Sequence, residues 1–317
     1  MLDVSCAADA RYIPHSAAML HSVLAHSGDE AVHVHYLHGP GFPADGAARL
    51  RQMVEAGGGR ISFLEIADDA VQGLPALDPG TGPAGEAISS AMWYRIFLPE
   101  LLPDVQRVLY LDVDTIVTAP LGPLWETQVA DHYLAAVTNV FQLDHLPRLA
   151  ELGFDDPRDY FNSGVVLFNL DLMRRDGAAE KLRDFGRTHS QELWWPDQDA
   201  LNLVLGSRRL PLHPRWNCMN SLLEFPWSVY VFGLRAVAET RESPAIRHFE
   251  GPARNKPWHY LCPTEMRAPY LKHRRQTPWP DVRLEGRTPA AMWARAVRIV
   301  RWRLIRRAQR RRGRVSA

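Results

Sequence analysis

The first third of the chain alternates short apolar runs with stretches that show helical spacing. The apolar runs over 1–8, 31–38 and 60–67 predict strands, and the segments 13–27 and 45–57 between them predict helices. Strands that alternate with helices are typical of a parallel, Rossmann-like sheet with helices on both faces. Ligands bind such sheets at the carboxyl ends of the strands, and Asp9 directly follows the first apolar run.

The rest of the chain continues the pattern less regularly. Residues 67–90 are rich in glycine and proline, which predicts a loop that is either an exposed connector or a lid over a ligand. Residues 90–103 have helical spacing that stops at Pro103. Further strands are expected over 107–117, 133–140, 161–170 and 245–251, and further helices over 171–190 and 197–205.

Two carboxylates interrupt the apolar strand pattern RVLYLDVDTIV at 107–117. Residues i and i+2 of a strand point to the same side, so Asp112 and Asp114 would face one spot and repel each other. A bound Mg²⁺ or Mn²⁺ would offset that repulsion, because both ions prefer oxygen ligands and pair readily with phosphates. The alternative is a turn at the strand end with a solvated acid.

Composition places the chain among globular proteins. With 317 residues and 46% hydrophobic content, it can form one large α/β domain or two smaller ones. Cys6, Cys218 and Cys262 are far apart, which argues against a disulfide framework or a cysteine metal site and fits a reducing compartment. The N-terminus lacks a signal-peptide pattern and no apolar run reaches about 18 residues, so we expect a cytoplasmic protein without a transmembrane helix.

Charge divides the chain into an acidic body and a basic tail. Residues 287–317 contain eleven arginines and no acid, whereas residues 1–286 carry a formal net charge of −10. From residue 291 the tail has Trp293, Val297, Val300 and Leu304 on one helical stripe. A basic amphipathic tail suits an anionic membrane surface. A solvated extension and a nucleic-acid contact are the alternatives, the latter disfavoured by the acidic body.

Other polar residues have ordinary structural interpretations when each is taken alone. The Asn162-Ser163-Gly164 segment fits a turn, Asp197 fits a helix cap, and Arg95 fits a helix-surface charge. His248 after a strand is more notable because Gly251 and Lys256 follow it. Glycine lets the backbone approach a ligand, lysine supplies a charge for phosphate oxygens, and histidine offers a nitrogen ligand to Mn²⁺.

The ordered set of these motifs resembles glycosyltransferase family 8, a family of retaining GT-A enzymes that includes bacterial lipopolysaccharide galactosyl- and glucosyltransferases and glycogenin. The resemblance runs from about Leu2 to Tyr260. It implies an α/β GT-A fold, a Rossmann-like mixed sheet flanked by helices, with residues 1–286 as catalytic domain and 287–317 as a helical basic tail.

The resemblance also implies roles for individual residues. Asp112, Asp114 and His248 would bind Mn²⁺ (or Mg²⁺), and Gln198, Asp197 and Arg95 would be the catalytic residues. Gln198 and Asp197 would stabilise an oxocarbenium-like state in a front-face substitution. The donor-binding set implied for a UDP-sugar comprises Ala8, Asp9, Tyr12, Arg95, Asp112, Val113, Asp114, Asn162, Gly164, Asp197, Gln198, His248, Gly251 and Lys256.

The function that the resemblance implies is Mn²⁺-dependent transfer of galactose or glucose from a UDP-hexose to a saccharide of lipopolysaccharide or a related surface glycan. The acceptor would be a saccharide or lipid-linked glycan, reached at the inner face of the membrane, and no nucleic-acid partner is expected. Two alternatives stay open. One is a protein- or self-glucosylating, glycogenin-like transferase. The other is a nucleotide-sugar-binding protein without transfer activity, if Arg11 and the long Gly251 to Lys256 segment weaken the site.

Overall fold

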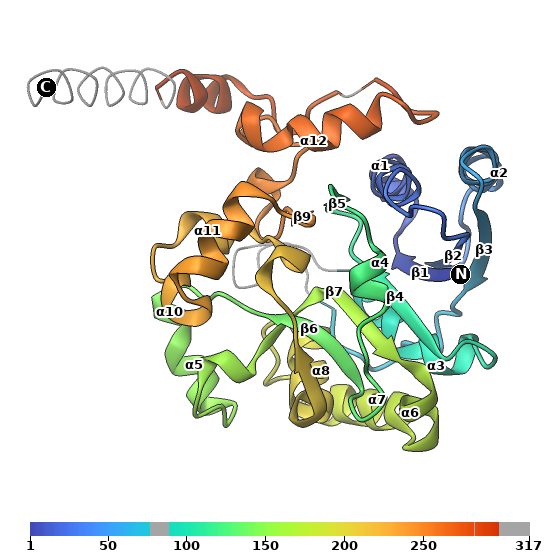
Figure 1. The fold of residues 1–317 in the computed structure, drawn as a ribbon, viewed down its shortest axis with the longest axis vertical. Helices are drawn as coiled ribbons and strands as arrows, with labels where there is room; N and C mark the ends of the chain where they lie inside the picture. Colours follow the sequence, from blue (N-terminus) through green and yellow to red (C-terminus); the bar gives the residue numbers. More distant parts are fainter. Residues whose placement is uncertain (77–88, 282, 298–317) are drawn as a thin grey trace, which may run out of the picture.

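A seven-stranded sheet forms the centre of the computed structural model, which describes residues 1–76, 89–281 and 283–297 (Figure 1). The strand order is β3-β2-β1-β4-β7-β6-β8. The strands are β1 (Leu2–Ala7), β2 (Val32–His38), β3 (Arg60–Glu65), β4 (Arg107–Leu111), β6 (Leu134–Thr138), β7 (Phe161–Asn169) and β8 (Arg209–Pro211).

Strand directions make the sheet mixed. β1, β2, β3 and β4 run parallel to one another, which confirms the direction predicted for the first third of the chain. β7 runs antiparallel to both β4 and β6, and β8 runs parallel to β6. The loops that follow β1 and β4 therefore meet at the same edge of the sheet.

Helices cover both faces of the sheet, as Figure 1 shows. On one face Val4, Cys6 and Val34 form a core with the inner sides of α1 (Ile13–Leu24) and α2 (Ala44–Ala56). On the other face Tyr110 and Val166 belong to a core completed by α6 (Leu170–Arg175), α7 (Ala178–Thr188) and α8 (Pro196–Leu205). Burial of each large apolar side chain stabilises the fold by about 1.5–3 kcal/mol.

The expected strand over 107–117 is broken in the middle, so that prediction was wrong. β4 ends at Leu111, residues 112–114 form a turn, and β5 (Thr115–Val117) leaves the main sheet. β5 pairs antiparallel with β9 (Ile246–His248), with Thr115 opposite His248. The two carboxylates thus converge through a turn rather than through strand alternation, and the second sheet brings His248 beside them.

Two expected helices also differ from the prediction. The helix expected over 171–190 is split into α6 and α7 at Gly177, whose φ of +62° is a left-handed conformation that favours glycine. Residues Ser90–Phe97 form a 3₁₀ helix, η2, before the short α3 (Leu98–Leu101). Pro99 has no N–H to continue an α-helical ladder there, and the Leu98 N–H donates to the Arg95 carbonyl instead.

The remaining helices lie between the strands or after the last strand. The α-helices are α4 (Gly122–Trp125), α5 (Leu146–Glu151), α9 (Asn220–Glu224), α10 (Ser228–Phe232), α11 (Leu234–Glu242) and α12 (Thr264–Arg274). The other 3₁₀ helices are η1 (Ala10–Tyr12), η3 (Leu143–His145), η4 (Pro157–Asp159), η5 (Gly206–Arg208), η6 (Pro214–Asn217) and η7 (Ala253–Asn255). Residues 77–88 of the predicted loop lie outside the described residues.

The C-terminal segment packs on the body through α12, which contacts α1. Residues 289–297 are helical, with Met292, Trp293 and Val297 exposed. The rest of the predicted stripe, Val300 and Leu304, lies outside the described residues. Within the part of the chain that the structure describes, no helix has the length and apolar character needed to span a membrane.

Candidate active site

A cavity of about 280 Å³ opens where β1 and β4 end. Its walls come from the segment after β1, the 3₁₀ helix η2, the 112–114 turn, the N-terminus of α8 and the segment before Trp258. Ten of the predicted site residues line it, namely Ala8, Asp9, Tyr12, Arg95, Asp112, Val113, Asp114, Asp197, Gln198 and Lys256. The structure thus brings together residues that lie up to 248 positions apart in the sequence.

Asp112 and Asp114, which line this cavity, converge with His248. The His248 Nε2 atom lies 3.3 Å from Asp114 Oδ1 and 4.0 Å from Asp112 Oδ2, and one ligand atom from each residue lies within 4.8 Å of the others. Burial alone would lower the pKa of His248, but the charges of Asp114 and Asp112 raise it above its ordinary value. The site therefore attracts positive charge.

The surroundings fit a bound divalent cation. Asn217 accepts a hydrogen bond from His248 Nδ1 through its Oδ1 at 2.9 Å, which leaves Nε2 free to act as a ligand. Gly164 keeps the space open, since a Cβ there would lie 2.3 Å from His248 Cε1 and 2.7 Å from Asp112 Oδ2. Two carboxylates and one imidazole suit Mn²⁺ or Mg²⁺.

Arg95 is buried and joins the metal-ligand cluster to α8. Its Nη2 donates to Asp112 Oδ1 at 3.0 Å, and its Nε lies 3.2 Å from Asp197 Oδ2. That Nε–H donates to the Met92 carbonyl, so Asp197 Oδ2 is buried without a hydrogen bond from any described residue. Burial raises the pKa of Asp197 to about 6, with Arg95 opposing the rise. A buried carboxylate oxygen without a donor suits a ligand hydroxyl.

Gln198 lies beside Asp197 with its amide fixed on both sides. Its Oε1 accepts from Ser163 N at 3.0 Å and from Asn162 Nδ2 at 3.2 Å, while its Nε2 donates to Tyr160 Oη at 3.3 Å. The Tyr160 hydroxyl in turn donates to Asp199. These contacts orient the Gln198 side chain toward the cavity that it lines.

Lys256 reaches the same cluster despite the long segment between Gly251 and Lys256. That segment contains the short turn η7, and Lys256 Nζ lies 2.6 Å from Asp114 Oδ2. Burial would raise the pKa of Asp114, but Lys256 and His248 outweigh it and hold the pKa well below its ordinary value. Arg11, the other residue named as a possible weakness of the site, is mostly exposed and pairs with Asp9.

Comparison with known proteins assigns this site to a family. A sequence model of the glycosyl transferase family 8 matches residues 3–262. The chain belongs to glycosyltransferase family 8. General stress protein A of Bacillus subtilis is 32% identical over 281 residues, covering 87% of this chain and 93% of that protein.

Solved structures and a further relative agree with family 8 membership. The galactosyltransferase LgtC, solved in complex with donor and acceptor sugar analogs, superposes with a TM-score of 0.76 at 26% identity over 87% of this chain and 96% of LgtC. The lipopolysaccharide 1,2-glucosyltransferase of Escherichia coli K12 is 25% identical over 74% of this chain and 66% of that protein. The chain therefore has the GT-A fold of a family 8 glycosyltransferase, which fits a divalent metal and a nucleotide-sugar donor.

A second cavity of about 690 Å³ adjoins the first in this family 8 protein. The two cavities share Asp112, Asp114, Trp195, Gln198 and Lys256. Three of the remaining predicted residues, Asn162, His248 and Gly251, line the second cavity. The fourth, Gly164, lies against the side chains of His248 and Asp112. Two separate ligands can thus reach the same residues, one from each cavity.

Sequence reasoning missed three residues that hold the site in place. Asn217 orients His248, Tyr160 bonds to Gln198, and Ser163 donates its backbone N–H to Gln198. Ser163 lies within the Asn162-Ser163-Gly164 motif and Tyr160 lies two residues before it, so their proximity to Asn162 was the available signal. Asn217 has no such signal, because it lies 31 residues before His248, at the end of the 3₁₀ helix η6.

Aromatic rings form the wall of the first cavity near Tyr12. His15 stacks on Trp258 with ring centroids 3.8 Å apart, and its Nδ1 lies 2.7 Å from Tyr270 Oη. Burial lowers the pKa of His15 to about 3, with Arg274 acting in the same direction. His15 is therefore neutral in the folded protein at neutral pH.

Acid is expected to destabilise the fold partly through His15. Below the ordinary histidine pKa of 6.5, His15 is protonated in the unfolded chain but stays neutral in the folded protein until about pH 3. The free energy of unfolding therefore decreases as the pH is lowered through that window. Between pH 7 and pH 5 this one group should cost roughly 2 kcal/mol. Urea unfolding at both pH values should show a smaller fall in His15→Gln than in the unmodified protein. An equal fall in both would contradict this assignment.

Proposed function

We propose that this chain is a retaining, Mn²⁺-dependent transferase that moves galactose or glucose from a UDP-sugar to a saccharide of lipopolysaccharide or a related surface glycan. The observation that carries the proposal is the placement of Asp112, Asp114 and His248 at the junction of two cavities. A donor in the first cavity and an acceptor in the second would meet beside these ligands and Gln198.

The first cavity is assigned to the donor. Asp9, Ala8 and Tyr12 would bind the uracil and ribose. Asp112 and Asp114, which line this cavity, would hold a divalent cation together with His248. A cation held there would supply positive charge to offset the diphosphate and the negative charge that UDP gains as the glycosidic bond breaks. Lys256, already within reach of Asp114, supplies a further positive charge to the same phosphates. Gly251, with a φ of +88°, lets the backbone before Lys256 turn toward them.

Retention of configuration fits a front-face substitution at this site. A double displacement needs a nucleophile, and the Gln198 Oε1 atom is an amide oxygen that already accepts from Ser163 and Asn162. We therefore assign Gln198 and Asp197 to stabilise positive charge on the sugar ring, with the Asp197 Oδ2 atom accepting from a sugar hydroxyl. Arg95 holds Asp197 and Asp112 in place.

Replacing Gln198 tests that assignment. Gln198→Ala should lower kcat roughly tenfold to a hundredfold and leave Mn²⁺-dependent UDP affinity nearly unchanged, because Gln198 would act on the sugar rather than on the nucleotide. Steady-state kinetics and calorimetry measure the two quantities. A variant with unchanged kcat would contradict the role. Leu203→Ala, a half-buried position of α8 outside both cavities, controls for damage to the helix.

The second cavity is assigned to the saccharide acceptor. It contains polar groups suited to sugar hydroxyls, including Ser221, whose buried Oγ has no hydrogen-bond partner among the described residues, and the carboxylate of Glu224. The named relatives support this class of acceptor, since one is a lipopolysaccharide glucosyltransferase and LgtC was solved with an acceptor sugar analog.

The proposed activity is tested by UDP release from a panel of UDP-hexoses with Mn²⁺, with and without sugar acceptors. The expected result is release confined to UDP-galactose or UDP-glucose and accelerated by a saccharide. Glucosylation of the protein itself, seen as a mass increase, would favour the glycogenin-like alternative. Metal-dependent UDP binding without turnover on any acceptor would favour a binding protein.

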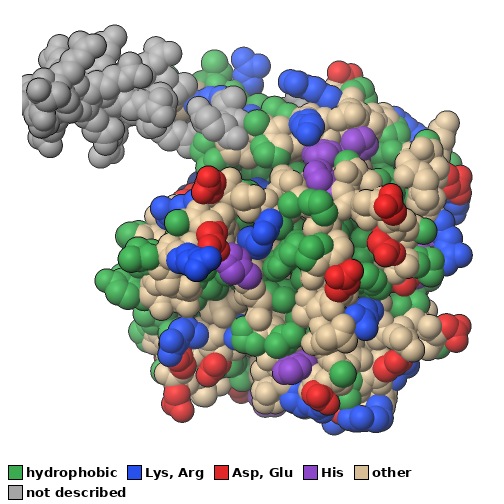
Figure 2. All heavy atoms as spheres, viewed as in Figure 1, with side chains coloured by type: hydrophobic (Ala, Val, Ile, Leu, Met, Phe, Trp, Pro, Cys, Tyr) green, Lys and Arg blue, Asp and Glu red, His purple; other side chains and the backbone are tan. Residues whose placement is uncertain are grey.

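The basic tail is proposed to hold the enzyme on an anionic membrane at the inner face. The face drawn in Figure 2 shows acidic and basic side chains interspersed over the body. In the sequence, by contrast, eleven arginines and no acid follow residue 286. Trp293, in the described part of this segment, is 74% exposed. Each basic residue near such a surface contributes about 1 kcal/mol.

Truncation after residue 286 tests the tail. The full chain should sediment with vesicles that contain phosphatidylserine and not with neutral vesicles, and the truncated chain should lose most of this binding while it still releases UDP. Full sedimentation of the truncated chain would contradict the proposal. Salt-sensitive binding of DNA or RNA, which we do not expect, would instead favour the nucleic-acid alternative.

A further inference from the structure

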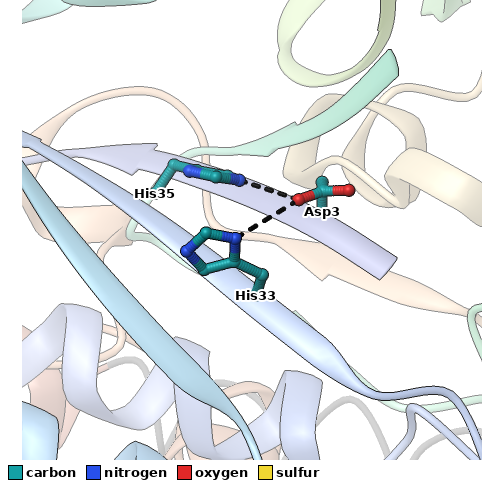
Figure 3. A group of neighbouring side chains, drawn as sticks. All are labelled: Asp3, His33 and His35. Atoms are coloured by element: carbon teal, nitrogen blue, oxygen red, sulfur yellow. Dashed lines mark hydrogen bonds and ion pairs between the residues drawn. The ribbon is translucent and has the colours of Figure 1, made fainter. Parts of the chain in front are cut away.

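A second cluster of potential metal ligands lies at the opposite end of the sheet from the catalytic cavity. Asp3 stands near the start of β1, and His33 and His35 stand near the start of the neighbouring β2 (Figure 3). Asp3 pairs with His33 in the strand register, and the two histidines are two residues apart, so all three side chains point to one face of the sheet. Nothing in the proposed transfer reaction uses these residues.

The three side chains converge closely. The Asp3 Oδ1 atom lies 2.8 Å from His35 Nε2 and 3.6 Å from His33 Nδ1, and one ligand atom from each residue lies within 4.8 Å of the others. Asp3 and His35 are buried, and His33 is only partly exposed. Ligands held on adjacent strands of a buried sheet are pre-organised, so a cation would not need to order a loop.

Hydrogen bonding shows which nitrogens of the cluster carry protons. Arg60 Nη2 donates to His33 Nδ1 at 3.0 Å, so the proton of this imidazole is on Nε2, which donates to Ser62 Oγ at 2.8 Å. His33 Nδ1 therefore faces the Asp3 carboxylate with a lone pair. His35 Nε2 donates its proton to Asp3 Oδ1 at 2.8 Å, because a carboxylate only accepts, and a cation that binds Nε2 would displace this proton. His35 Nδ1 is buried and has no hydrogen-bond partner among the described residues.

We propose that Asp3, His33 and His35 form a second, structural metal site that takes Zn²⁺ or a similar imidazole-preferring ion. Two imidazoles and one carboxylate, with a fourth position left to water, form a set of ligands that zinc commonly accepts. His33 also has the outer hydrogen bond, to Ser62, that ligating histidines usually make. The catalytic cluster has two carboxylates and one imidazole, so the two sites should prefer different ions.

Arg60 competes with the ion for this position. Its guanidinium donates to the His33 nitrogen that would bind the metal, yet Arg60 is exposed at the start of β3 and is free to turn toward solvent. A cationic group already attracted to this point shows that the cluster favours positive charge. The ion would join β1 to β2 and stabilise the sheet by binding only the folded chain.

Zinc titration tests the proposal. It is done in a variant that lacks Asp114, one of the proposed ligands of the catalytic cation. In the Asp114→Asn background we expect one Zn²⁺ per chain by calorimetry, a visible absorption band with Co²⁺, and a higher melting temperature with Zn²⁺. Adding His33→Gln should weaken Zn²⁺ binding at least about 100-fold. Adding His21→Gln, which changes a histidine near His273 instead, should leave it unchanged.

A gain in affinity distinguishes the metal site from simple loss of structure. Arg60→Ala removes the competing guanidinium and should tighten Zn²⁺ binding, an effect that misfolding cannot produce. His33→Gln should keep Mn²⁺-dependent UDP release in the otherwise unmodified chain, because it lies outside both cavities. Zinc binding that survives His33→Gln, or no zinc binding by a folded Asp114→Asn chain, would overturn the proposal without touching the proposed transfer reaction.

Discussion

Replacement of Asp114 by asparagine is expected to lower the rate of Mn²⁺-dependent UDP release by about 10³-fold, or about 4 kcal/mol in the barrier. Both carboxylate oxygens of Asp114 contact basic side chains of the site. Oδ1 lies 3.3 Å from His248 Nε2, and Oδ2 lies 2.6 Å from Lys256 Nζ. Asparagine has nearly the same shape but no charge. It would weaken the binding of the cation and remove the negative charge that Lys256 contacts.

The control for this prediction is Asp104→Asn, which makes the same chemical change at an exposed site outside both cavities. It should leave UDP release within about twofold of the unmodified rate. Circular dichroism and thermal unfolding of both variants separate loss of the cation from loss of the fold. Full activity in a folded Asp114→Asn chain, at every Mn²⁺ concentration, would show that this carboxylate does not hold the ion.

Gly164→Ala is expected to abolish metal binding through shape alone, with UDP release also falling by about 10³-fold. The added Cβ would lie 2.3 Å from His248 Cε1, 2.7 Å from Asp112 Oδ2 and 2.9 Å from His248 Nε2. His248 cannot simply move away, because Asn217 holds its Nδ1 and β5 pairs with its strand. The methyl group would therefore displace one ligand from the position that the cation needs. Manganese titration followed by electron paramagnetic resonance measures the loss.

Gly206→Ala provides a matched control for this substitution. Gly206 has a helical φ of −60°, and a Cβ there would meet no atom within 4 Å. The control should bind Mn²⁺ and release UDP at the unmodified rate. Normal Mn²⁺ affinity in Gly164→Ala would mean that the cation sits elsewhere, and the assignment of the metal ligands would be wrong.

The first third of the fold could be predicted because its hydrophobic periods are regular. Short runs with valine, leucine and tyrosine, such as 31–38, are separated by helical patterns, so a parallel arrangement follows from general rules of α/β sheets. The break after Leu111 could not be predicted. The apolar residues 115–117 continue the strand pattern, and only their pairing with Ile246–His248, more than a hundred residues later, moves them to a second sheet.

The sequence allowed the residues of the candidate site to be named together, but not the way in which the fold brings their side chains together. Asp112 and Asp114 were recognised by their position after a strand, yet their convergence depends on a turn and not on strand alternation. Asn217 and Tyr160 were missed because each acts through contacts with side chains that are distant in the sequence. Contacts of this kind leave no periodic pattern in a single sequence.

Calorimetric titration of UDP into the purified chain, with and without Mn²⁺, tests the central claim most directly. The claim is that Asp112, Asp114 and His248 hold the ion that holds the diphosphate. It predicts binding with one UDP per chain that strengthens at least about 100-fold with Mn²⁺, and no such gain in Asp114→Asn or Gly164→Ala. UDP affinity that is equal with and without Mn²⁺, or a gain that persists in both variants, would contradict the account.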